Sequence, residues 1–100
     1  PNKVAAYVVQ AQLALARGDL DEARSLANTA SRASPDHPHV AALLGTIALR
    51  SGDPTRALKI LGPASASHPD DRVLRHALGF AYMANGNLAF AEQAFRGLLE

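Results

Sequence analysis

Small and apolar residues recur along this chain with the period of a helix, and no stretch is rich in strand-forming residues. In the middle of the chain Ala41, Leu44, Gly45 and Ala48 follow the spacing i, i+3, i+4, i+7, which places them on one helix face. The 21 alanines and 14 leucines favour helix throughout, because these residues lose little free energy on entering one. The pattern predicts six helices, at residues 4–16, 20–33, 38–50, 54–67, 72–84 and 88–100.

Turn-forming residues separate these helices. Gly52 is expected to end one helix, since glycine adopts the left-handed conformation, and Asp53 and Pro54 suit the cap and first position of the next. Asp19 and Glu22 have the spacing of a capping box, in which each side chain accepts from the other residue's backbone N–H. Further caps are expected at Asp71 and Asn87.

An internal repeat of 34 residues runs through the sequence. Gly18, Gly52 and Gly86 stand at this interval. The same shift relates three further sets: Ala23, Ala57 and Ala91; Asp19, Asp53 and Asn87; Ala27, Leu61 and Phe95. A fixed period of this length indicates a solenoid, in which each repeat is one supersecondary unit.

On these residues the sequence resembles the tetratricopeptide repeat family over essentially its whole length. The second and third copies carry the family pattern at Leu44, Gly45, Ala48, Gly52, Ala57, Leu61, Ala64 and Pro69, and at Leu78, Gly79, Tyr82, Gly86, Ala91 and Phe95. The resemblance implies an all-α fold, a right-handed α-solenoid of three helix–turn–helix hairpins, in one domain over residues 1–100 with repeats near 4–37, 38–71 and 72–100. The first copy departs from the pattern at Ala11, Ala14 and Ala27, which predicts a looser, terminal-type repeat or one that packs on something outside this segment.

The resemblance also implies a binding groove. In that family the first helix of each hairpin lines a concave surface that binds peptides or partner helices. Carried over residue by residue, the lining is Ala5, Val8, Val9, Gln12, Leu15, His39, Ala42, Leu43, Thr46, Leu49, Arg50, Val73, His76, Ala77, Phe80 and Met83. Phe80 and Met83 lie three apart and are therefore neighbours on one stripe, which makes them the strongest contact candidates.

The ligand expected in this groove is apolar. At the positions that in the resembled family bind the C-terminal carboxylate of heat-shock chaperones, this chain has Val8, Gln12, Leu43, Val73 and Ala77, none of them a cation. The resemblance therefore predicts an amphipathic helix or an extended segment with apolar anchors.

Composition and charge remove several other classes of function. The net charge of +1 is far from the basic load of a phosphate-binding protein, which disfavours nucleic acid even though a related family of helical hairpins reads RNA. There is no cysteine and hence no thiolate zinc site or disulfide. The longest nearly apolar stretch, residues 41–49, is half the length needed to span a bilayer.

The polar residues do not form a catalytic or metal-binding pattern. His37, His39 and His68 invite a metal interpretation, but none forms the i, i+4 pair on a helix that zinc sites use. His37 and His68 are instead expected to face water in the turns between repeats. Asp70 and Asp71 precede a helix, where carboxylates are favoured by capping. We therefore expect no enzymatic activity, no metal and no cofactor in this segment.

The last predicted helix is more apolar than its counterparts. It carries Phe90, Phe95, Leu98 and Leu99, whereas the residues matching Leu99 in the earlier copies are serines. An uncovered apolar surface of this kind marks an association site, so we expect self-association through residues 88–100.

The function predicted for the segment is that of a protein-interaction module without catalysis. Three alternatives stay open: a secretion-type chaperone, a self-assembling structural element, and an accessory domain of an enzyme. The chain begins at Pro1 without a methionine, so it is expected to be a piece of a longer protein. Its alanine- and arginine-rich composition is typical of a bacterial one. The compartment, cytoplasmic or periplasmic, is left open.

Overall fold

The computed structural model describes residues 3–99, and within this range the regular structure is entirely helical. The six helices are α1 (Lys3–Ala16), α2 (Leu20–Ala33), α3 (Pro38–Arg50), α4 (Pro54–Ser67), α5 (Arg72–Ala84) and α6 (Leu88–Leu99). The predicted helices are confirmed, with α1 beginning one residue earlier than expected. The predicted end of the last helix, Glu100, lies outside the described residues.

The three turns within hairpins are nearly identical. Gly18, Gly52 and Gly86 have φ of 81°, 82° and 80°, a conformation that favours glycine because it has no Cβ. In each turn the glycine N–H donates to the carbonyl three residues earlier, and the next residue's N–H donates to the carbonyl five residues earlier, at 2.8–3.1 Å. This pattern of two hydrogen bonds satisfies the last carbonyls of α1, α3 and α5. The repeat in the sequence is therefore a repeat in backbone geometry.

Aspartates cap the helices that follow. The carboxylates of Asp19, Asp53 and Asp71 accept hydrogen bonds from backbone N–H groups three residues later, at 3.0–3.2 Å. The predicted capping box is only half formed: the Glu22 carboxylate pairs with Arg17 at 2.8 Å, and the Asp19 N–H donates to a carbonyl of α1. The Schellman-type turn has already satisfied that N–H, so no partner is needed from Glu22.

The histidines between hairpins differ from the expectation. His37 is half-buried and caps α3, its Nδ1 accepting from the His39 N–H at 3.1 Å, and His68 is half-buried at the end of α4. At Asn87 the side-chain oxygen accepts from Asn85 Nδ2 at 2.7 Å. The His37 and Asn87 side chains thus stabilise turns by local hydrogen bonds.

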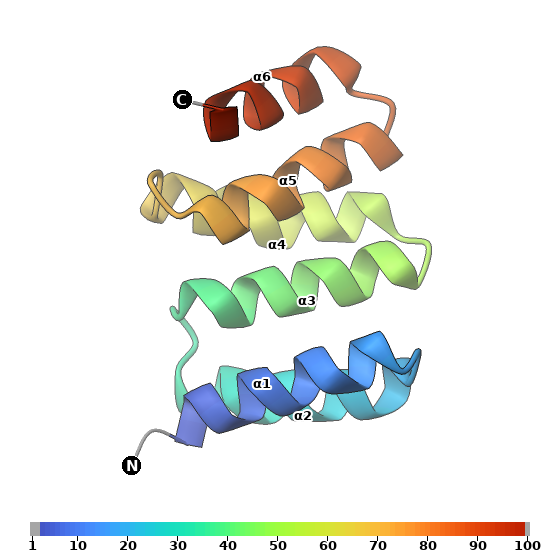
Figure 1. The fold of residues 1–100 in the computed structure, drawn as a ribbon, viewed down its shortest axis with the longest axis vertical. Coiled ribbons are helices and arrows are strands. Elements are labelled where there is room, and N and C mark those ends of the chain that lie inside the picture. The colour runs from blue at the N-terminus through green and yellow to red at the C-terminus, as the bar shows by residue number, and fades with distance from the viewer. Residues whose placement is uncertain (1–2, 100) are drawn as a thin grey trace.

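The helices pair into three antiparallel hairpins that stack along the longest axis of the molecule, which measures 38 × 26 × 21 Å (Figure 1). The first and last helices lie at opposite ends of this stack. The central helix α3 contacts α1, α2, α4 and α5, so it is buried from both sides. Its residues Val40, Leu43 and Ile47 pack toward the first hairpin, and Ala42 and Ala48 belong to the cluster with α4 and α5.

Within each hairpin one small residue of the first helix packs against one side chain of the second helix. A Cβ at Gly45 would come within 2.5 Å of the Leu61 side chain, and one at Gly79 within 2.7 Å of Phe95. The equivalent residues of the first hairpin, Ala11 and Ala27, are both completely buried in one cluster. Close helix approach thus depends on a matched pair at one repeated position.

Candidate functional site

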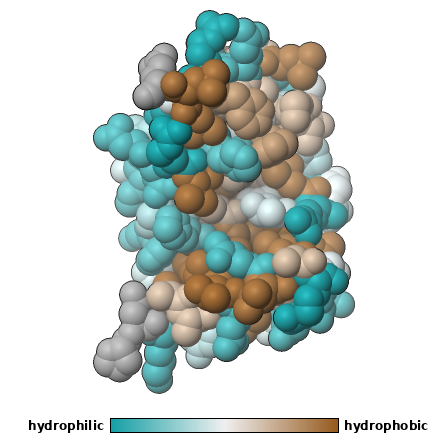
Figure 2. All heavy atoms as spheres, viewed as in Figure 1, coloured by the Kyte–Doolittle hydropathy of each residue, from teal (hydrophilic) through white to brown (hydrophobic). Residues whose placement is uncertain are grey.

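A cleft of about 620 Å³ runs across the first helices of the three hairpins. These helices lie on the side of the molecule that faces the viewer in Figure 2, where hydrophobic and polar side chains alternate. The lining residues come from α1, α3 and α5: Gln12, Leu15, His39, Ala42, Leu43, Thr46, Leu49, Arg50, Val73, His76, Ala77, Phe80 and Ala84.

The floor of the cleft is apolar and rigidly held. Leu15, Leu43 and Ala77 are buried members of the two hydrophobic clusters, so their positions are set by packing between hairpins. Val73 and Phe80 rise from α5 as exposed side chains. An apolar ligand side chain placed here would exchange water contact for contact with both.

Aromatic contacts hold Phe80 in place. Its ring lies edge-on to His76 and to Phe95, with centroids 4.9 Å and 5.2 Å apart. Such edge-to-face contacts are favourable for aromatic rings. Phe95 comes from α6 and packs on Gly79, so the second helix of the third hairpin positions a side chain of the cleft.

The polar groups of the cleft are cationic or neutral. Arg50 Nη1 donates to the Leu15 carbonyl at 2.8 Å, which ties the end of α3 to the end of α1. His39 Nε2 lies 3.8 Å from Asp71 Oδ2, beside the other end of the cleft. Among the described residues that line it, none is an aspartate or a glutamate. An arginine has five N–H donors, so Arg50 keeps donors beyond the one that this bond uses.

A sequence model of the tetratricopeptide repeat matches the chain twice, over residues 1–47 and 48–100. The chain belongs to the tetratricopeptide repeat family. Members of this family are in general non-catalytic helical repeats that mediate protein–protein interaction. No curated protein sequence matches the chain.

Most residues expected in the groove of this tetratricopeptide repeat chain lie in the cleft. Four do not. Val8 is buried in the core between α1, α2 and α3, whereas Ala5 and Val9 of α1 and Met83 of α5 are exposed outside the cleft. Ala84, which was not expected, also lines the cleft. Helical spacing alone could not separate Met83 from Ala84, because both follow Phe80 within about one turn.

The residues expected to mediate self-association are not equivalent in the structure. Leu99 is 88% exposed. Phe90 is exposed but stacks on Tyr82, with ring centroids 5.3 Å apart. Phe95 packs inside the third hairpin against Gly79, and the half-buried Leu98 accepts a hydrogen bond from Arg72 through its carbonyl. Phe95 therefore has an internal packing role instead of the outward one expected.

Residues 3–99 hold no group of three or more His, Cys, Asp or Glu side chains placed to bind a metal ion. None of their helices combines the length and hydrophobicity needed to cross a membrane.

Proposed function

We propose that this chain is a protein-interaction module of three tetratricopeptide repeats in one domain, without catalysis of its own, that binds a peptide or an amphipathic helix in its cleft. The observation that carries the proposal is the cleft itself, because it is apolar and shared by α1, α3 and α5. A ligand lying across these helices would contact all three hairpins at once. The family's general role in protein–protein interaction supports the same function.

The residues around the cleft favour a ligand with two kinds of group. Apolar side chains suit Leu43, Val73 and Phe80, which offer an extended hydrophobic surface. A carboxylate suits Arg50, whose remaining donors face no acidic side chain in the lining. The proposed ligand is therefore an apolar segment with an acidic residue near one end, and not a polycationic one.

A matched pair of substitutions on α5 tests the use of the cleft. Peptides selected from a random display library against the chain serve as probes, and their affinities are measured by calorimetry. Phe80→Ala should weaken binding by about 1–4 kcal/mol, the range found on truncating an interface anchor. Met83→Ala removes an equally exposed side chain outside the cleft and should leave affinity unchanged. Loss of binding with Met83→Ala alone would place the ligand elsewhere.

A second role, self-association through α6, is favoured by the exposure of Leu99 and Phe90. If α6 is an association surface, Leu99→Glu and Phe90→Glu should each lower the average mass seen in sedimentation of the concentrated chain. A mass that is monomeric at all concentrations, with or without these charges, would remove this role.

A further inference from the structure

A second cavity, of about 570 Å³, opens on the middle hairpin and shares no lining residue with the cleft. It lies between α3 and α4, beside the turn that joins α2 to α3. Its walls include residues of both helices and of that turn: Pro35, Asp36, Ala41, Leu44, Ile60 and Pro63. We call it the Ala41 cavity.

The repeat shows what the other two hairpins hold at the position of Ala41. Residues 7, 41 and 75 are equivalent under the 34-residue shift. In the first hairpin Tyr7 is partly buried against the core cluster. In the third, the half-buried Arg75 lies over Gly97, where an added Cβ would come within 2.7 Å of the arginine Nη1. Both hairpins therefore carry a large side chain where the middle hairpin has only a methyl group. The Ala41 cavity is the space that such a side chain would take.

Arg75 shows which chemistry this space can satisfy. Its Nη2 donates to the Pro69 carbonyl at 2.6 Å. The equivalent of Pro69 in the middle hairpin is Pro35, which lines the Ala41 cavity. The Pro35 carbonyl accepts no hydrogen bond from residues 3–99, so it is an acceptor for a donor that enters the cavity. Pro63 replaces Gly97, and its ring adds an apolar wall.

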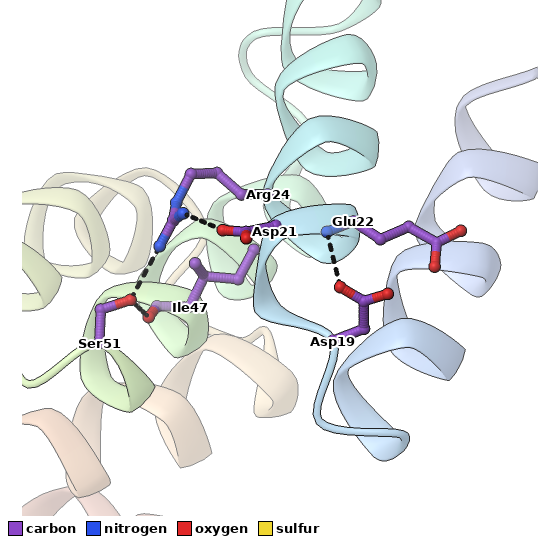
Figure 3. Close-up of polar contacts among 6 residues, drawn as sticks. All are labelled: Asp19, Asp21, Glu22, Arg24, Ile47 and Ser51. Carbon is purple, nitrogen blue, oxygen red and sulfur yellow. Dashed lines mark hydrogen bonds and ion pairs between the residues drawn. The ribbon is translucent and has the colours of Figure 1, made fainter.

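A carboxylate beside this acceptor makes the cavity suited to a cation. Elsewhere the chain satisfies aspartates internally. The Asp19 carboxylate accepts from the Glu22 N–H, and Asp21 pairs with Arg24 at 3.2 Å (Figure 3). By contrast, no group within residues 3–99 pairs with the Asp36 carboxylate. The Ala41 cavity thus combines a free negative charge with a free carbonyl.

We propose that the Ala41 cavity binds an arginine side chain presented by a protein partner. The methylene stem would lie along Leu44 and Ile60, since arginine buries its stem on apolar surface while its charged group stays among polar ones. The planar guanidinium would donate to the Asp36 carboxylate and to the Pro35 carbonyl at once. The partner's arginine would enter from solvent and take the space that Arg75 takes from within its own hairpin.

Two other occupants fit the cavity less well. A tyrosine, as at position 7, offers a single O–H donor to the two acceptors. A lysine carries the charge but lacks the planar fork that reaches two acceptors together. The cleft differs in sign, because it has Arg50 and no acidic side chain in its described lining. The proposal therefore does not rest on the ligand proposed for the cleft.

Short peptides test which side chain the cavity selects. The probes are capped tripeptides Gly-X-Gly in which X is arginine, lysine, tyrosine or norleucine, and binding is followed by the backbone amide NMR signals of the chain. The arginine probe should shift the signals of Asp36, Leu44 and Ala64 saturably. The other three probes should bind at least a few-fold more weakly, because none offers both the charge and the fork.

Four variants locate the site. Asp36→Asn, at an exposed position, should weaken the arginine probe a few-fold, the range for an exposed ion pair. Asp70→Asn is the matched control, since it changes the same position of the next repeat outside the cavity and should leave affinity unchanged. Ala41→Arg supplies the chain's own guanidinium, as Arg75 does, and should abolish binding. Phe80→Ala alters only the cleft and should change nothing.

Several results would overturn the proposal. Equal binding of the lysine probe would show that charge alone is recognised, and stronger binding of the tyrosine probe would show an aromatic occupant. Unchanged affinity in either Asp36→Asn or Ala41→Arg would place the arginine elsewhere. Absence of any saturable shift with the arginine probe would remove the site. Circular dichroism checks folding, and if Ala41→Arg does not fold, the comparison of Asp36→Asn with Asp70→Asn decides.

Discussion

The first and third hairpins solve the same packing problem with different side chains. In the third, Gly79 receives the ring of Phe95, whereas in the first Ala11 and Ala27 occupy the equivalent positions and are both fully buried. Either pair, glycine with a large residue or alanine with alanine, fills the space between two helices. The departure of the first copy from the family pattern therefore indicates a compensated contact and not the loose one that the sequence predicted.

The consequence of this difference lies in the cleft. The Phe95 ring packs on Gly79 and also contacts the ring of Phe80, and so it supports an exposed side chain of the cleft. Ala27 has no ring with which to support anything beyond its own hairpin. The third hairpin thus gains a link between its buried contact and the candidate ligand surface that the first hairpin lacks.

The largest effect is expected from a substitution that overpacks the contact between the two helices of the third hairpin. Gly79→Leu should destabilise the chain by about 3 kcal/mol, because its Cβ alone would lie 2.7 Å from the Phe95 ring. Gly97→Leu is the control: the three atoms nearest to a Cβ there belong to the flexible Arg75 side chain, which can move aside, so the loss should be smaller. Denaturant unfolding measures both, and equal losses would contradict the matched-pair description.

A double-mutant cycle sharpens the comparison by converting the third hairpin to the pair found in the first. Gly79→Ala should clash with Phe95, and Phe95→Ala should leave a space beside Gly79. The two changes together should cost about 1–2 kcal/mol less than their sum, because contacting residues are coupled. Additive losses in chemical denaturation would mean that the two hairpins are not interchangeable solutions.

The helix caps provide a smaller comparison between the first and third turns. Asp19→Ala removes the acceptor for the Glu22 N–H and should cost about 1 kcal/mol of unfolding free energy. Asn87→Ala removes an acceptor that receives Asn85 Nδ2, a side-chain contact on the surface, and should cost less. Thermal unfolding of the two variants decides the order, and a larger loss at Asn87 would contradict it.

The smallest expected effect is that of metal chelation on the thermal stability of the chain, in the first hairpin or the third. Excess EDTA should leave the melting temperature unchanged, since residues 3–99 hold no group of ligands whose metal binding could add to the free energy of folding. A fall of several degrees would bring His37, His39 and Asp36 back into consideration as ligands.

The helices and their turns were predictable because their causes are local. The turn hydrogen bonds around Gly52 and the cap at Asp53 involve residues within a few positions of each other, and each recurs after 34 residues. The capping box at Glu22 was predicted wrongly because its outcome depended on a competing partner, Arg17, and on a carbonyl of the preceding helix. The half-burial of His37 and His68 was likewise not predicted from the sequence.

By itself, the sequence determined six helices, three equivalent turns and a set of candidate side chains for the cleft. These features could be predicted because the helix period and the turn residues depend on positions close together in the sequence. Only the tertiary structure decided how residues on one helix are shared among neighbours. It assigned Val8 to the core, left Met83 outside the cleft, and turned Phe95 inward to support Phe80. The physical reason is that each first helix contacts several others at once, and a repeat period cannot show which of its faces a neighbouring hairpin covers.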